Sequence, residues 1–266
     1  MRLNKFIAEN TGVSRREADE MISSGKVTIN GETAVLGRQV SETDEVSVDG
    51  KPVKNRGGHV TIILNKPVGV LSSRRSQGGD KTVYDLLPTE YKSLKTAGRL
   101  DKDSSGLIIL SSDGDLIQQL THPKYEKTKV YQVELDKPLQ PLHQQMISDI
   151  GIDLPDGKSK FQIEKYRFSG EDSEHLTTNR SSMELTERQG PRPKGMGMSS
   201  GSDRLNSDAC EESFTENRYL VTMHEGRNRQ IRRTFDALGY TVVKLHRTSL
   251  GKYTLGELKP GKFVKI

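Results

Sequence analysis

The sequence predicts an α+β fold: a small helix-hairpin module followed by a larger domain with a mixed, mainly antiparallel sheet and flanking helices. Residues 1–50 combine a capped helix pattern with an Asn-Gly hairpin pattern. The rest of the chain contains short apolar or alternating segments, typical of strands, separated by amphipathic stretches that are typical of helices. Strands of mixed direction with helices laid outside them define the α+β class.

Composition narrows the class of protein. The 266 residues are 32% hydrophobic and 5% aromatic, and no run of about 18 apolar residues is present, which argues against a membrane-spanning helix. The formal net charge of +5 is consistent with a polyanionic partner but does not establish one. The single cysteine, Cys210, excludes an intrachain disulfide and a cysteine-based metal cluster. Because the first residues also lack an apolar signal core, we expect a cytoplasmic protein.

The module of residues 1–50 begins with two helices. Ser14-Arg15-Arg16-Glu17 has the spacing of a capping box, and the helix that it opens should end at Gly25. Residues 26–32 alternate and end in Asn30-Gly31, which predicts a hairpin, and residues 45–51 repeat the pattern of a strand followed by a turn. Acidic and basic residues balance in this module, so any contact with a polyanion would use one basic face.

Residues 51–59 are predicted to be a linker, because proline, glycine and basic residues dominate them, and residues 60–266 form the larger domain. Residues 170–215 carry few aliphatic side chains and predict a disordered insertion between two strands of the sheet. The strands expected in the larger domain are 61–65, 70–73, 107–110, 130–135, 161–168, 218–223 and 242–247, and the helices are 82–87, 115–120, 139–150 and 227–238.

Three groups of polar residues are candidates for function. Asp101 lies beside Arg99 and directly before an apolar strand, where a structural cap is the alternative interpretation. Tyr131 is expected on the polar face of strand 130–135, with cross-strand packing as its alternative. Arg229, Arg232 and Arg233 would share one face of helix 227–238 and contact phosphates, unless they form a solvated basic stripe.

Four motifs together resemble one enzyme family. They are Asn65-Lys66-Pro67-x-Gly69, Gly98-Arg99-Leu100-Asp101-x-x-x-x-Gly106-Leu107, Lys129-x-Tyr131 and Gly226-Arg227-Asn228-Arg229-Gln230-Ile231-Arg232-Arg233. In this order they resemble the pseudouridine synthases, specifically the ribosomal-RNA branch that carries an RNA-binding module of the type first described in ribosomal protein S-four. The Ser-Arg-Arg-Glu-Ala run and Val27-x-Ile29-Asn30-Gly31 carry the second resemblance. The insertion 170–215 is the main departure from the family pattern.

The resemblance implies isomerisation of uridine to pseudouridine in ribosomal RNA, with the large-subunit RNA as the expected substrate. It implies no cofactor, and no metal site is expected. The family's essential carboxylate corresponds to Asp101, acting as nucleophile or as base, Arg232 would be its partner, and Tyr131 would stack on the uracil. Base flipping is implied, with Arg99 holding the flipped nucleotide or filling its gap. The further RNA contacts that we expect are Arg15, Arg16, Lys66, Lys129, Arg227, Arg229 and Arg233.

Two other functions remain open at this stage. A non-catalytic RNA-binding factor for ribosome assembly could use the same basic surface, and a synthase acting on transfer RNA could use the same chemistry. The set of Asp101, Tyr131 and Arg232 favours the enzyme, because a binding protein gains nothing from a carboxylate facing phosphates. The expected partner is ribosomal RNA or a subunit precursor, with neither a membrane nor a nucleotide cofactor, and we expect a monomer.

Overall fold

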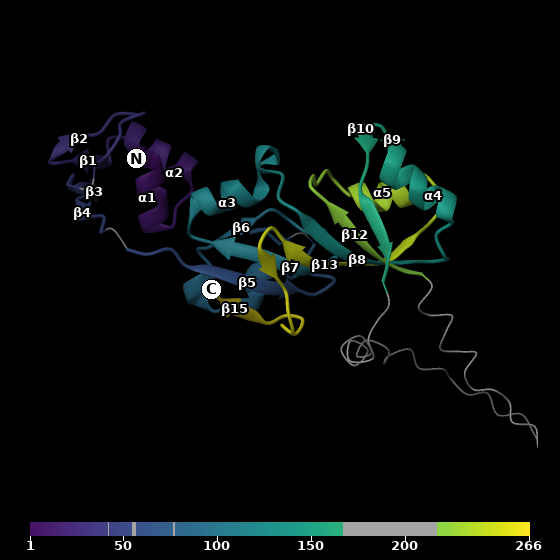
Figure 1. Ribbon diagram of the computed structural model, residues 1–266. Coiled ribbons are helices and arrows are strands. Elements are labelled where there is room, and N and C mark those ends of the chain that lie inside the picture. Colours follow the sequence, from purple (N-terminus) through teal and green to yellow (C-terminus); the bar gives the residue numbers. More distant parts are fainter. Residues whose placement is uncertain (42, 55–56, 77, 167–216) are drawn as a thin grey trace, which may run out of the picture. The chain divides into compact units, whose positions relative to one another are not determined.

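A computed structural model describes residues 1–266 with the exception of 42, 55–56, 77 and 167–216 (Figure 1). The predicted insertion at 170–215 lies outside the described residues. The chain divides into two compact units. The first contains residues 1–131, 222–230 and 245–266, and the second contains residues 132–221 and 231–244.

The N-terminal module contains two helices and a small sheet, as predicted. Helices α1 (Leu3–Thr11) and α2 (Arg15–Ser23) precede strands β1 (Val27–Ile29), β2 (Glu32–Thr33), β3 (Val46–Val48) and β4 (Lys51–Pro52), which are ordered β2-β1-β3-β4 (Figure 1). The capping box of α2 is present: the Glu17 N–H donates to Ser14 Oγ (3.2 Å), and the Ser14 N–H donates to Glu17 Oε2 (2.6 Å). Satisfying these two backbone donors fixes where α2 begins.

The predicted hairpin is confirmed at Asn30 and Gly31, which have φ angles of 50° and 86°. Two consecutive residues with positive φ match the twist of the flanking strands, and asparagine and glycine tolerate that conformation best. Strand β4 extends the sheet by two residues into the segment predicted as a linker. The core of the module consists of Leu3, Phe6, Ile7, Ala18, Ile22, Val27, Ile29, Ala34, Val40 and Val46.

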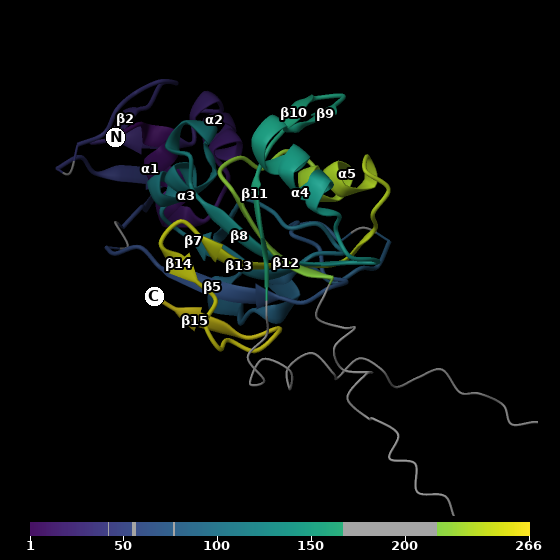
Figure 2. The same cartoon turned by 45° about the vertical axis from the view of Figure 1, so that its right-hand side comes forward.

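In the first unit, the larger sheet has the strand order β13-β7-β5-β15 (Figure 2). The strands are β5 (Thr61–Lys66), β6 (Lys95–Ala97), β7 (Ser105–Ser111), β13 (Val242–Leu250), β14 (Tyr253–Thr254) and β15 (Phe263–Lys265). Strands β6 and β5 pair with β7 antiparallel, and β13 pairs with β7 in parallel. The observed mixed and mainly antiparallel sheet confirms the predicted fold class.

Strand β5 is buried along its whole length because both of its faces are covered. Ile62 and Leu64 belong to one apolar cluster, together with residues from the 3₁₀ helix η1 (Val83–Leu86). Ile63 belongs to a second cluster, which includes Leu120 of helix α3 (Gly114–Thr121). Successive side chains of a strand point to opposite faces, so this continuous apolar run serves two cores at once.

The second unit contains strands β11 (Gln162–Lys165), β12 (Arg218–Met223), β8 (Lys129–Leu135) and β13, which neighbour one another in this order. The predicted pairing of the two strands on either side of the insertion is thus confirmed. Strands β8, β12 and β13 contribute residues to both units. The unit also contains the hairpin of β9 (Ile152–Leu154) and β10 (Gly157–Ser159), helix α4 (Pro141–Gln145) with the π-helical turn η4 (Met146–Ile150), and part of helix α5 (Gln230–Asp236).

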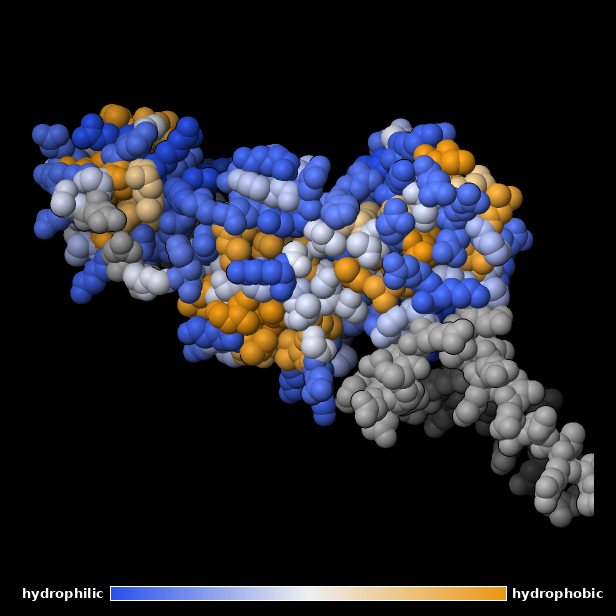
Figure 3. Space-filling view, viewed as in Figure 1, coloured by the Kyte–Doolittle hydropathy of each residue, from blue (hydrophilic) through white to orange (hydrophobic). Residues whose placement is uncertain are grey.

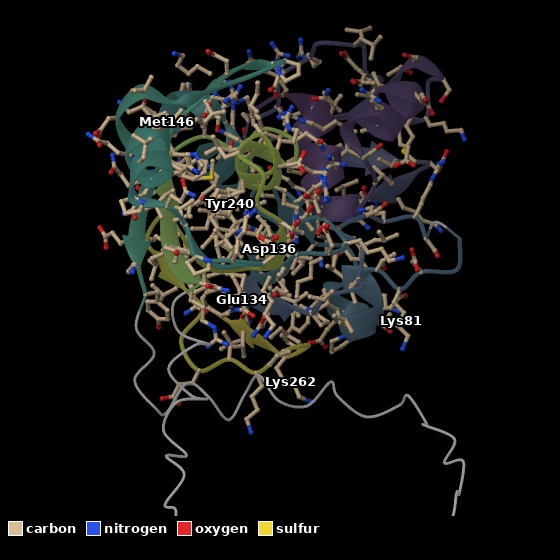
Figure 4. All side chains as sticks on the ribbon, turned by 90° about the vertical axis from the view of Figure 1, so that its right-hand side faces the viewer. Lys81, Glu134, Asp136, Met146, Tyr240 and Lys262 are labelled. Atoms are coloured by element: carbon tan, nitrogen blue, oxygen red, sulfur yellow. The ribbon has the colours of Figure 1, made fainter. Side chains whose placement is uncertain are left out.

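Tyrosine hydroxyls tie the segment before α4 to the rest of the second unit. The Tyr240 hydroxyl accepts from the N–H of Gln140 (3.2 Å) and lies 2.8 Å from Nδ1 of His143 (Figure 4). The buried Tyr219 accepts from the N–H of Leu139 (2.7 Å). Buried hydroxyls need such partners, and here they satisfy backbone groups that precede or open a short helix.

Three local predictions were wrong. Residues 70–73 form only an isolated bridge, between Leu71 and Thr82, instead of a strand. Helix 227–238 begins at Gln230, because Arg229 has a φ of 46°, which no α-helix accommodates. Tyr131 shares the buried face of β8 with Val133 and Leu135, since positions 131, 133 and 135 alternate together.

Within the described residues, no helix is long and apolar enough to cross a membrane. Figure 3 shows an apolar area around β15, where Val264 and Ile266 are exposed.

Candidate active site

Asp101 lies in a turn between β6 and β7 that neighbouring loops hold in place. The N–H of Ser104 donates to the carbonyl oxygen of Asp101 (3.1 Å), which closes the turn. The Ser72 hydroxyl donates to the Leu100 carbonyl (2.8 Å) and accepts from the Leu100 N–H (3.1 Å). The Asp101 side chain keeps 36% of its surface exposed. The result is a fixed backbone that presents an accessible carboxylate.

Lys66 supports the same turn from the core. Its side chain is completely buried, and Nζ donates to the carbonyl oxygens of Ser104 (2.6 Å) and Pro67 (3.0 Å). Burial lowers the pKa of Lys66 to about 8, although the nearby carboxylates of Asp103 and Asp101 act in the opposite direction. An ammonium group in this position has no surface for a phosphate, so Lys66 is withdrawn from the expected RNA contacts.

Arg229 brings a second positive charge to Asp101. Its Nη1 lies 3.8 Å from Asp101 Oδ2. Its guanidinium also donates from Nη1 to Asp103 Oδ1 (3.1 Å) and from Nη2 to Asp103 Oδ2 (2.8 Å). The hydrogen bond with Asp103 raises the pKa of Arg229 further above its already high value. Two carboxylates and one guanidinium therefore form a compact charged cluster.

A hollow of about 400 Å³ opens beside this cluster, within the size range of small-molecule sites. It is lined by Val68, Gly69, Lys102, Asp103 and Arg229. The Gly69 N–H donates to the Lys102 carbonyl (2.8 Å), which joins the two loops that form the rim. Val68 is 63% exposed at this rim.

The sequence prediction missed four of these lining residues. Val68, Gly69, Lys102 and Asp103 all lie within or directly beside the quoted motifs, and their proximity to Lys66 and Asp101 was the available signal. It was overlooked because adjacency along the chain does not reveal which side chains point to a common space. The prediction did include Arg229, but as a phosphate contact on a helix.

On β8, Lys129 is half-buried and Tyr131 is buried. Tyr131 is 8% exposed. The Nζ of Lys129 donates to the carbonyl oxygens of Lys127 and His224, both at 3.2 Å. Burial and, to a smaller extent, the charge of Arg247 lower the pKa of Lys129. Lys129 is thus held by the chain itself, as a positive charge beneath the loop that leads to α5.

The remaining arginines of the fourth motif have partners of their own. Arg227 Nη2 lies 3.3 Å from Glu225 Oε1, and Gln230 donates to the same carboxylate oxygen. Arg232 and Arg233 belong to the second unit, where Arg232 donates to the Val242 carbonyl (2.7 Å). Arg233 pairs with Asp156 of the β9–β10 hairpin at 2.7 Å. Arg232 and Asp101 lie in different units, so their expected pairing stays a prediction.

Arg15, Arg16 and Arg99 are exposed. Arg15 and Arg16 occupy the first turn of α2, and Arg99 lies two residues before Asp101. Exposure is the condition for contact with a phosphate backbone, and these three arginines meet it without rearrangement.

Known proteins match this chain along its length. Residues 60–237 match the family model described as RNA pseudouridylate synthase, and residues 1–46 match that of the S4 domain. The ribosomal large subunit pseudouridine synthase B of Bacillus subtilis is 33% identical, over 98% of this chain and 89% of its own. The ribosomal small subunit pseudouridine synthase A of Vibrio cholerae is 30% identical, over 99% and 94%.

A solved structure described as a pseudouridylate synthase has a TM-score of 0.57 and 26% identity, covering 100% of this chain and 96% of the other. The family model, the relatives and this solved structure point to one family, and the resemblance drawn from the four motifs is confirmed. This chain belongs to the RNA pseudouridine synthases, a family of isomerases, and it carries an S4 domain in residues 1–46.

Proposed function

We propose that this protein converts uridine to pseudouridine in ribosomal RNA, with the large-subunit RNA as its substrate. The observation that carries the proposal is the accessible carboxylate of Asp101, held on a fixed turn beside the guanidinium of Arg229. Family membership supplies the reaction, and the two relatives named for ribosomal subunits supply the class of RNA. The identity of 33% with the large-subunit enzyme of Bacillus subtilis supports the choice of subunit.

The proposed reaction rearranges one nucleotide and needs no external group. The bond between uracil N1 and ribose C1′ breaks, the uracil turns, and C5 bonds to C1′. N1 gains a proton and C5 loses one, so atoms and electrons balance. Asp101 acts at the ribose as nucleophile or at the uracil as base. The positive charges beside this carboxylate are the guanidinium of Arg229, 3.8 Å from Asp101 Oδ2, and the buried ammonium of Lys66.

The target uridine has to leave its helix or loop to reach Asp101. Extruding a nucleotide costs a few kcal/mol, and stacking on an aromatic ring recovers about 1–3 kcal/mol per base. In the proposed complex Tyr131 stacks on the uracil, Arg232 orients Asp101, and Arg99 fills the gap in the RNA or holds the flipped nucleotide. The exposure of Arg99, two residues from Asp101, supports its role.

The remaining proposed RNA contacts divide between the module and the larger domain. Arg15 and Arg16 lie exposed at the start of α2. Arg227 and Arg233 already pair with carboxylates, so each has to exchange a carboxylate for a phosphate when RNA binds. Arg229 is 43% exposed and can contact a phosphate from its open side while it stays paired with Asp103. Lys129 contributes positive charge from below the surface, because its Nζ is bound to two carbonyls.

The decisive experiment is pseudouridine mapping of ribosomal RNA with the wild type and with Asp101→Asn. We expect a new pseudouridine only with the wild type, because an amide can serve neither as nucleophile nor as base. RNA affinity and the unfolding temperature should be nearly unchanged, because the side chain of Asp101 is exposed. Carbodiimide modification followed by primer extension on the RNA of each subunit measures the reaction.

Asp153→Asn is the matched control, since Asp153 is an exposed carboxylate of the β9–β10 hairpin paired with Lys158 at 3.7 Å. This variant should modify the same uridine as the wild type. A new pseudouridine in small-subunit RNA alone would contradict the choice of subunit. Tight RNA binding by the wild type without any new pseudouridine would favour an assembly factor and reject the enzyme.

A further inference from the structure

Two carboxylates compete for one guanidinium at the rim of the hollow. Both terminal nitrogens of Arg229 donate to Asp103, at 3.1 and 2.8 Å. The distance from Arg229 Nη1 to Asp101 Oδ2 is 3.8 Å. Hydrogen bonds between nitrogen and oxygen span about 2.7–3.2 Å. Asp103 therefore takes the bidentate pair, and Asp101 receives attraction from the charge without a hydrogen bond to it.

The backbone positions of the three residues are fixed, so only their side chains can change partners. Asp101 and Asp103 lie on the turn that Ser104 closes and that Lys66 supports. Arg229 directly precedes α5 and has a φ of 46°, and this backbone conformation fixes the direction of its Cα–Cβ bond. The side chains of Arg229 and Asp103 remain 43% and 45% exposed. A guanidinium with that freedom can reach either carboxylate.

A carboxylate that attacks ribose or removes a proton has to offer an oxygen to the substrate. Arg232 is already the proposed partner of Asp101, so a bidentate pair with Arg229 as well would leave no carboxylate oxygen for the substrate. A guanidinium held just outside hydrogen-bond distance supplies charge and leaves an oxygen accessible. We propose that Asp103 is a positioning residue that holds Arg229 beside Asp101 and prevents it from closing onto the Asp101 carboxylate. The inference rests on the proposed catalytic role of Asp101.

Two lysines are further positive charges of this turn. Lys66 lies beneath the turn, and Lys102 follows Asp101 on the rim, paired with Asp80 at 2.7 Å. Replacing Asp103 removes the bidentate partner of Arg229 and also one of the two carboxylates that raise the pKa of Lys66. Only the first effect depends on the guanidinium, so a double variant that also lacks Arg229 separates the two.

The first test is structural and needs no RNA. Crystal structures of the full chain are determined for the wild type and for Asp103→Ala. We expect the Arg229 guanidinium of the variant to move within about 3 Å of an Asp101 carboxylate oxygen, because its preferred acceptor is gone. An Arg229 side chain that turns to solvent, or that keeps its distance from Asp101, overturns the proposal. Asp103→Asn provides a second variant of nearly unchanged shape.

The second test is kinetic, on the ribosomal RNA that the wild type modifies. Asp103→Ala should lower kcat about tenfold and leave KM within about twofold, because Arg229 would then pair with Asp101 and hinder the reacting carboxylate rather than RNA binding. Asp103→Glu should retain most of the activity. Adding Arg229→Gln to Asp103→Ala should raise kcat to that of Arg229→Gln alone, since the intruding guanidinium is then absent.

Losses that multiply in the double variant would overturn the proposal, as would full activity of Asp103→Ala. Asp153→Ala is the control for removal of an exposed carboxylate and should behave as the wild type. If the wild type forms no pseudouridine, the proposed function fails by itself, and the crystal structures still decide whether Asp103 holds Arg229 away from Asp101.

Discussion

At the scale of single residues, burial decides the roles of the charged side chains around Asp101. Lys66 and Arg229 both carry positive charge near this carboxylate, yet Lys66 is completely buried and Arg229 is exposed at the rim. The sequence shows two basic residues in two motifs and gives no sign of this difference. Lys66 therefore supports the turn by donating hydrogen bonds to carbonyl oxygens, whereas the exposed guanidinium of Arg229 lies within reach of two carboxylates.

The buried ammonium of Lys66 makes stability depend on pH. Its pKa is about 8 in the folded protein, compared with 10.5 for a solvated lysine. Between these values the unfolded chain binds more protons, so the free energy of unfolding rises with pH. Relative to Lys66→Met, we expect the wild type to gain up to about 3 kcal/mol between pH 8 and 10.5. Urea unfolding of both proteins across this range measures the difference.

Lys262→Met is the matched control, because Lys262 is exposed on the loop before β15 (Figure 4). Its difference from the wild type should not change over the same pH range. A difference between wild type and Lys66→Met that is equally flat would show that Lys66 is not held in a desolvated position.

At the scale of elements, β7 is the strand that carries the site. It follows the Asp101 turn directly and pairs with β5, β6 and β13. At its start, Gly106 pairs in parallel with Arg247, and a Cβ built on Gly106 would lie 2.3 Å from the Arg247 carbonyl oxygen. This contact brings the two backbones closer than any side chain permits.

Gly106→Ala should therefore destabilise the protein by more than about 3 kcal/mol, through steric overlap added to the cost of its φ of 106°. Gly239→Ala tests the backbone cost alone, because Gly239 also has a positive φ but no atom lies within 4 Å of its built Cβ. For that variant we expect a loss of about 1–2 kcal/mol. Similar losses from the two substitutions, measured by thermal or urea unfolding, would contradict the close approach of β7 and β13.

At the scale of the whole molecule, the net charge of +5 is modest, so the protein has to bind a polyanion through local clusters of basic residues. In the module, Arg15 and Arg16 stand exposed at the start of α2, and the capping box fixes that start. In the larger domain, Arg227, Arg229 and Arg233 are paired with carboxylates. The module therefore offers the positive charge that needs the least rearrangement.

Replacing Arg15 and Arg16 together by alanine should weaken RNA binding and reduce its salt dependence. Each lost phosphate contact lowers the slope of log affinity against log salt by about 0.7–0.9. The matched variant with lysine at both positions keeps the charges and should keep the slope. Filter binding of ribosomal RNA at several salt concentrations measures it, and an unchanged slope in the alanine variant would remove both residues from the proposed contacts.

The sequence by itself determined the fold class, the capped helix and hairpin of the module, the strand that follows Asp101 and the family. These features depend on local signals: a capping box, an Asn-Gly turn and apolar runs of strand length. The choice of Asp101 as the proposed catalytic carboxylate also came from its motif. The confirmed β11–β12 pairing came from two alternating segments that remain recognisable despite the long stretch between them.

Only the tertiary structure decided which charges meet. Arg229 lies outside the helix predicted for it, because its own φ is positive and α5 begins only at Gln230. The periodicity of the sequence cannot reveal the backbone conformation of one residue. Lys66 was buried and Asp103 was placed against Arg229 because contacts between distant segments fix both positions. A motif names the residues that are available, whereas side-chain direction and burial depend on the packing of elements far apart in the chain.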